Sequence, residues 1–180
     1  MFNTIINGLC IIGFILLIIC FFLNNGNFID IRQIIRDHIK IYVNNKFQFT
    51  VIFIIPLVFS LRIATITCIS KDILENLNVV LSIFITMFIT ILSILSSIKN
   101  NNDIPNYNLV KRETFTAAMF ETLLCIILLI ISFVASCFIK YISTLHLTVL
   151  SLIVYYILII ILLNTLLILK RLKKLHDNEK

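Results

Sequence analysis

Apolar residues occur along the chain in five runs, each about as long as a helix that crosses a bilayer, which needs about 20 residues. The runs cover about residues 4–23, 49–68, 77–98, 117–138 and 145–169. Only a few residues separate the last two, which predicts that they form an antiparallel pair. The pattern predicts an all-α fold: a polytopic transmembrane helix bundle with five spans that forms a single integral membrane domain.

The second run has the weakest pattern of the five because it contains Pro56 and Arg62. Proline removes a backbone hydrogen-bond donor, and an arginine side chain in lipid costs several kcal/mol unless it reaches the interface. If this run is re-entrant, or if the first run is peripheral, the bundle has four spans.

The segment 27–43 has a different pattern, with apolar residues on one face of a helix and polar residues on the other. The apolar face consists of Phe28, Ile31, Ile35, Ile39 and Tyr42, and the flanking cations are Arg32, Arg36 and Lys40. This arrangement predicts a short interfacial amphipathic helix that lies on an anionic inner leaflet. A docking face for a soluble partner is the alternative interpretation.

Hydroxyl side chains recur within the third run at spacings of four, four, three and four residues, which places them on one face of a helix. They are Ser82, Thr86, Thr90, Ser93 and Ser97. Small polar residues at this spacing let two helices approach closely and bond to each other. We expect this stripe to pack against another helix of the same subunit; lining a water-filled path between several copies is the alternative.

The composition agrees with a membrane protein: of 180 residues, 60% are hydrophobic and 13% are charged, and the mean hydropathy is +1.08. Twelve of the 15 Lys and Arg residues lie between the first two runs, in the connector 99–116 or in the basic tail 170–180. The positive-inside rule then predicts a multi-pass membrane protein with the N-terminus outside and the C-terminus cytoplasmic. Because topology and anionic headgroups explain the net charge of +6, no nucleic-acid partner is expected.

Two ionisable residues, Arg62 and Glu121, lie within predicted spans, where charged groups are functional candidates. Their distances from the span ends place them at different depths, so we do not expect them to pair. Arg62 is expected to extend outward toward Asp72. Glu121 is expected to stay protonated or to reach Lys111 or Arg112, and both a functional role and simple anchoring at the interface are open for it.

The sequence contains no recognisable catalytic or phosphate-binding motif, and its three glycines form no phosphate-binding loop. The three histidines, His38, His146 and His176, lie in or beside loops and are interpreted as interfacial polar residues. We therefore expect no enzyme activity, no cofactor and no metal site.

Several stretches resemble a loosely defined group of small multi-span membrane proteins from low-GC Firmicutes, often encoded in phage-defence or mobile loci. These stretches are IPLVFSLRIA, NVVLSIFITMFITILSIL, VKRETFTAAMFETLLCIILLI and VYYILIIILLNTLLILKRL. The resemblance implies a multi-pass protein of the bacterial inner (cytoplasmic) membrane. It would be an effector or anchor of a defence system, which perturbs the membrane as a homo-oligomer when a soluble partner from the same operon signals. A bacteriocin-immunity or transporter-accessory protein is the first alternative, and a holin-like pore former is the second.

Overall fold

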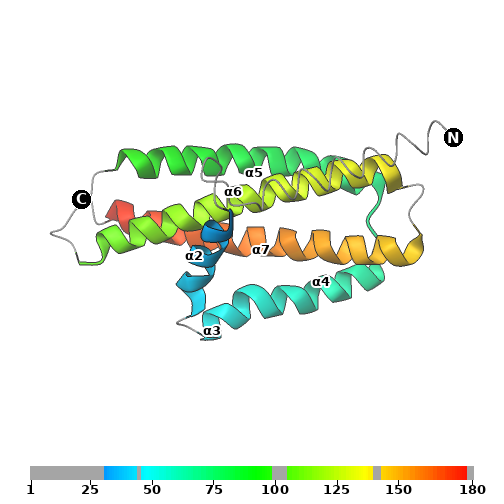
Figure 1. Cartoon of the computed structure of the whole chain (residues 1–180), viewed down its shortest axis with the longest axis horizontal. Coiled ribbons are helices and arrows are strands. Elements are labelled where there is room, and N and C mark those ends of the chain that lie inside the picture. Colours follow the sequence, from blue (N-terminus) through cyan, green and yellow to red (C-terminus); the bar gives the residue numbers. More distant parts are fainter. Residues whose placement is uncertain (1–30, 44–45, 99–104, 140–142, 178–180) are drawn as a thin grey trace.

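The computed structural model describes residues 31–43, 46–98, 105–139 and 143–177 (Figure 1). These residues are helical apart from short connections. The helices are α2 (Ile31–Val43), α3 (Lys46–Phe49), the π-helix η1 (Thr50–Ile54), α4 (Ile55–Ile66), α5 (Lys71–Ser97), α6 (Tyr107–Phe138) and α7 (Thr144–Asp177). The all-α prediction is confirmed for this part of the chain.

Four helical segments among the described residues are long and apolar enough to cross a membrane, which indicates a multi-pass membrane protein. They are Phe47–Ile66, which joins α3, η1 and α4, and the whole of α5, α6 and α7. The first predicted span, 4–23, lies outside the described residues, and so do residues 27–30 of the predicted amphipathic helix.

The span with Pro56 is a continuous helical segment of 20 residues. Pro56 lies in the first turn of α4 and, having no N–H, donates no bond to the turn before it. The turn before it is a π-helix, in which the Ile55 backbone N–H donates to the Thr50 carbonyl. The chain therefore accommodates the proline by a local change of helical pitch, and the helix does not break there.

The other three spans are longer than the apolar runs that predicted them. α6 begins at Tyr107, so the second half of the predicted connector 99–116 is helical, and α7 includes residues 170–177 of the predicted tail. Asn106 has a φ of 64°, in the left-handed region that asparagine tolerates, and its carbonyl accepts the first helical bond from Val110. Hydropathy marks only the apolar part of a helix, whereas the helix itself continues through charged residues of good helical propensity.

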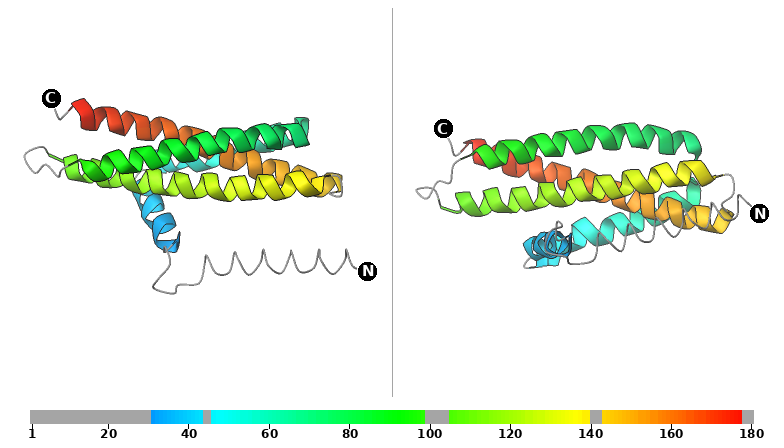
Figure 2. Two further views of the ribbon diagram at one scale, coloured as in Figure 1. Left: turned by 90° about the horizontal axis from the view of Figure 1, so that it is seen from above. Right: turned by 45° about the horizontal axis from the view of Figure 1, so that its top comes forward.

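The long helices lie side by side in the order α5, α6, α7, α4, and the short helix α2 crosses α6 instead of running along it (Figure 1). Figure 2 shows α2 projecting from one side of the bundle. Buried Leu and Ile side chains and Phe88 form most of the core. Hydrogen bonds also connect separate elements: Ser132 Oγ of α6 donates to the Leu74 carbonyl of α5 at 3.1 Å, and the N–H of Ile69, in the connection between α4 and α5, donates to Ser151 Oγ of α7 at 2.9 Å.

Candidate functional site

Two polar side chains face each other inside the apolar part of the bundle, Glu121 on α6 and Asn164 on α7. Each is fully buried, with 0% of its surface exposed. At about 1.5 Å per residue, Glu121 lies about 21 Å from Tyr107 and Asn164 about 20 Å from Asp177, so the antiparallel helices bring them to one level. Asn164 Nδ2 donates to Glu121 Oε1 at 2.6 Å. This bond joins α6 and α7 within their apolar segments.

The amphipathic helix α2 extends this contact. Tyr42, in its last turn and 1% exposed, donates from its hydroxyl to Asn164 Oδ1 at 3.3 Å. Asn164 therefore holds Tyr42 with its carbonyl oxygen and Glu121 with its amide nitrogen. A continuous chain of hydrogen bonds thus runs from α2 through α7 to α6.

His38 is the second α2 residue at this site, one helical turn before Tyr42. It is fully buried, and its ring stacks on Phe120 of α6 with the ring centres 3.9 Å apart. Burial, together with the positive charge of Arg171, lowers the pKa of His38 to about 3. Burial also raises the pKa of Tyr42 to about 12, so both side chains are neutral where they dock. The interpretation of His38 as an interfacial polar residue is therefore wrong. We call His38, Tyr42, Phe120, Glu121 and Asn164 the junction cluster.

The junction cluster is incompletely bonded. Within the described residues, both ring nitrogens of His38 and Oε2 of Glu121 are buried and make no hydrogen bond. Each unsatisfied buried polar group costs about 1 to 3 kcal/mol. The docked position of α2 therefore includes an energetic penalty that is relieved when these groups reach water, and docking relies on ring packing and on the Asn164 bonds.

An ion pair lies toward the charged ends of the same helices: Arg171 Nη2 of α7 is 3.4 Å from Glu113 Oε2 of α6. Both side chains are partly buried. We call this end of the bundle the basic end, because it carries Lys111, Arg112, Lys170, Arg171, Lys173 and Lys174. No group of three or more His, Cys, Asp or Glu side chains that could hold a metal ion occurs among the described residues.

The predicted apolar face of α2 is rotated in the structure. Ile31 is buried and Ile35 half-buried, but Ile39 is 37% exposed. The three cations of the helix, Arg32, Arg36 and Lys40, are exposed, and Lys40 pairs with Asp37 at 3.4 Å. Because His38 occupies the buried face in place of Ile39, the face that docks is more polar than the sequence pattern indicated.

The hydroxyl stripe of α5, which comprises Ser82, Thr86, Thr90, Ser93 and Ser97, is exposed. Ser82, Thr86 and Thr90 donate to carbonyls four residues earlier in their own helix, at 2.8 to 3.0 Å. The first three residues of the stripe line an open groove together with Val79, Ile83 and Met87. The expected packing of the stripe inside one subunit is therefore wrong for the described helices, because the buried face of α5 is its Leu and Phe face.

The two predicted intramembrane charges lie in different surroundings. Arg62 is on the exposed face of α4, and Glu121 is in the core. Glu121 bonds to Asn164 and does not reach Lys111, whose Nζ donates to the Ile98 carbonyl at 2.5 Å. The expectation that Arg62 and Glu121 do not pair agrees with these positions.

Sequence reasoning missed Asn164, Phe120 and the role of His38. A signal for Asn164 was present: it is an amide in the middle of a strongly apolar run, and polar groups in lipid mark candidate sites. Its level along α7 matches that of Glu121 along α6 only when the two helices are taken as an antiparallel pair. No comparable signal marks Phe120, which looks like any lipid-facing aromatic residue.

Comparison of the chain with protein-family models, curated proteins and solved structures found no match.

Proposed function

We propose that this chain is a bacterial cytoplasmic-membrane protein that acts as an oligomeric effector or anchor in an anti-phage defence-type system. It perturbs or permeabilises the membrane when a soluble partner from the same operon signals. The observation that carries the proposal is the junction cluster, because it connects a helix outside the spans to polar groups inside them. A partner that binds α2 thereby acts on the interior of the bundle.

The trigger in this proposal is withdrawal of α2. The exposed cations of α2 and its exposed Ile39 and Val43 are available to a partner or to the inner leaflet. When α2 leaves, Tyr42 leaves the Asn164 carbonyl, and His38 uncovers Phe120 beside Glu121. Polar groups exposed in a low-dielectric bundle are stabilised by water, so water enters from the basic end.

In this proposal, a water-filled path wide enough to permeabilise the membrane forms between several copies of the chain. The four apolar helical segments that the structure describes leave little room for an aqueous pore in one subunit, whereas copies that meet through the hydroxyl stripe surround a shared path. The hydroxyls donate within their own helix and keep oxygen lone pairs for water or for a neighbouring copy.

In this proposal the basic end is cytoplasmic, as the positive-inside rule requires. Single cysteines at Arg36 and Lys173 on a cysteine-free background are expected to react with a membrane-impermeant maleimide only after the cells are opened. A cysteine at Asp72 is expected to react in intact cells. Labelling of position 173 from outside would invert the scheme.

A membrane-potential dye in cells that express the protein without its partner tests the effector role. Tyr42→Ala, which mimics withdrawal of α2, is expected to depolarise the membrane, whereas wild type and the matched control Ile39→Ala are expected to remain silent. Trypsin cleavage at Arg36 after the cells are opened reports whether α2 has left the bundle. If the helix is released and the membrane stays polarised, the effector role is wrong and a harmless immunity or accessory protein is favoured.

Substitutions in the stripe test the assembly. Replacing Ser82, Thr86, Thr90 and Ser93 together by Leu is expected to split the oligomer, because the larger side chains keep the helix backbones apart. Replacing the same four residues together by Ala is expected to preserve the oligomer and to change ion leakage through it. Thr65→Leu on α4 is the matched control, because Thr65 is also exposed and bonds to its own helix. The readouts are particle size in detergent and dye release. A Leu set that leaves both unchanged removes the stripe from the proposal.

A further inference from the structure

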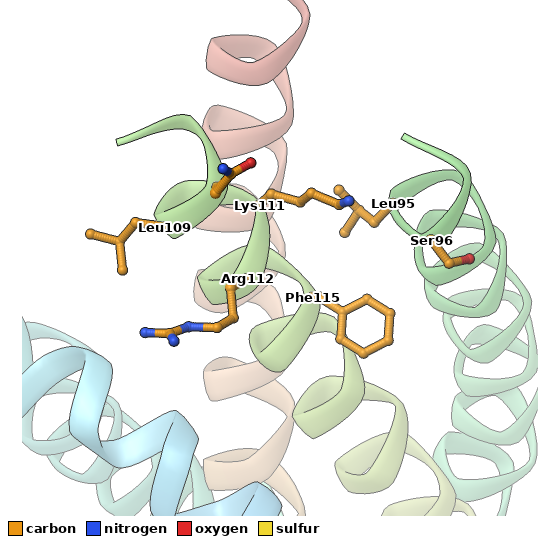
Figure 3. Close-up of a pocket in the computed structure, with 7 residues that line it drawn as sticks. Leu95, Ser96, Leu109, Lys111, Arg112 and Phe115 are labelled. Carbon is orange, nitrogen blue, oxygen red and sulfur yellow. The ribbon is translucent and has the colours of Figure 1, made fainter. Parts of the chain in front are cut away.

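A cavity separate from the groove of the hydroxyl stripe lies at the basic end, on the surface of α6 near the last turn of α5. It is an open cavity of about 560 Å³, lined by Leu95, Ser96, Asn108, Leu109, Lys111, Arg112 and Phe115. Figure 3 shows Lys111 extended toward α5, with Phe115 on the same side, while Arg112 and Leu109 point the other way. The cavity is separate from the junction cluster, which lies where α2, α6 and α7 meet.

The lining of this cavity changes character along α6. Arg112 is exposed and Lys111 is half-buried, and none of the lining residues that the structure describes is acidic. Phe115 lies about 4.5 Å from Arg112 along the helix axis, toward the apolar part of α6, and is 38% exposed. Cations therefore lie at the level where α6 leaves its apolar segment, and an apolar surface lies directly below them.

We propose that this cavity binds a phospholipid with an anionic headgroup. The phosphate lies between the two cations and pairs with the Arg112 guanidinium, which presents several N–H donors to phosphate oxygens, while Lys111, on the side of Phe115, adds the attraction of its charge. The first part of an acyl chain lies on Phe115. The occupant is a lipid and not a soluble anion, because the same cavity offers an aromatic surface that free phosphate leaves exposed. The proposal requires only that α6 crosses a membrane, so it is independent of the effector role.

The site predicts selectivity between lipid headgroups. Each Lys or Arg near an anionic surface contributes enough attraction to change binding about fivefold. Native mass spectrometry of the full-length protein in detergent, titrated with phosphatidylglycerol, is expected to show one tightly retained lipid per subunit. Phosphatidylcholine, which has no net charge, is expected to bind at least about fivefold more weakly.

Substitution of the exposed arginine gives the sharper test. Arg112→Gln is expected to weaken phosphatidylglycerol binding about fivefold and to leave phosphatidylcholine binding unchanged. Lys173→Gln, which removes another exposed cation of the basic end, is the matched control and is expected to bind like wild type. Far-ultraviolet circular dichroism checks that both variants keep their helices.

A second comparison identifies the source of the phosphate. Phe115→Ala is expected to weaken retention of long-chain phosphatidylglycerol, and millimolar inorganic phosphate is expected not to displace the lipid. Displacement by phosphate alone, equal retention of the neutral lipid, or unchanged binding in Arg112→Gln would each overturn the proposal.

Discussion

The junction cluster and the hydroxyl stripe are both polar regions of apolar helices, but they satisfy their hydrogen bonds in opposite ways. In the stripe, Thr86 and Thr90 each donate to a carbonyl four residues earlier in the same helix. In the junction cluster, Asn164 bonds to Glu121, 43 residues away, and to Tyr42, 122 residues away. The stripe is exposed and the cluster is buried.

This difference decides what each region does for the fold. A hydroxyl bonded to its own backbone is compatible with lipid, water or another copy, because its donor is satisfied before any tertiary contact forms. An amide that bridges three helices is satisfied only in the folded bundle, and loss of one partner leaves the others unpaired in a region without water. The cluster is therefore a place where the fold depends on polar residues, and the stripe is not.

The largest expected effect is at the ring of Tyr42. Tyr42→Ala removes a buried ring that packs on His38 and Phe53 and bonds to Asn164. We expect this substitution to make α2 docking less favourable by about 3 to 5 kcal/mol. Ile39→Ala, on the exposed side of the same helix, is expected to have little effect. The rate of trypsin cleavage at Arg36 measures docking. Equal cleavage of the two variants would show that α2 is not held by this face.

The next effect isolates the bridging amide. Asn164→Leu leaves Glu121 and Tyr42 without their shared partner, and we expect the unfolding free energy to fall by about 1 to 3 kcal/mol. Thr165→Val is the matched control, because the Thr165 hydroxyl beside it donates to the Ile161 carbonyl of its own helix. Reversible unfolding in mixed micelles gives both values. If the two variants have equal unfolding free energies, the bonds of Asn164 to other helices stabilise the fold no more than the bond of Thr165 within its own helix.

A smaller, graded effect follows from the neutral state of His38. Its pKa is about 3 when docked, against about 6.5 for a histidine in water, so only the undocked helix takes up a proton between these values. Docking is therefore fully favoured above pH 6.5 and weakens by about 1.4 kcal/mol for each pH unit below it.

Trypsin is inactive at low pH, so reaction of a cysteine at Val43 with a pH-tolerant thiol reagent is the measurement between pH 7 and pH 5. The groups around His38 include Tyr42 and Arg171, and Arg171 stays charged throughout this range. His38→Phe preserves the stacking on Phe120 and is expected to abolish the pH dependence. An unchanged pH dependence in this variant would assign the titration to another group.

The smallest expected effect is in the stripe. Thr86→Ala removes a hydroxyl that is bonded within its own helix, so we expect the stability of one subunit to change by less than about 0.5 kcal/mol. Unfolding in mixed micelles again gives the value. A loss as large as that of Asn164→Leu would mean that the hydroxyl has a tertiary partner, and the contrast between the two regions would disappear.

Much of the architecture follows from the sequence because hydropathy and length act locally. The runs at 49–68, 77–98, 117–138 and 145–169 each correspond to a helical segment that is long and apolar enough to cross a membrane, although the helix ends differ. The helix ends were predicted less accurately, because the apolar runs stop at the first charged residues. The helices themselves continue through charged residues such as Lys111 and Arg171. The periodicity of α2 predicted a helix with one apolar face, but it placed Ile39 on the buried side.

The sequence determined that this chain forms apolar helices of membrane length, that one short segment is amphipathic, and that a stripe of hydroxyls lies on one face of α5. These properties depend on the spacing of neighbouring residues. Only the tertiary structure decided that the stripe faces outward, that α2 crosses α6, and that Tyr42, Asn164 and Glu121 meet. Their meeting depends on how three helices pack, and the spacing of residues within one helix carries no information about the position of the other two.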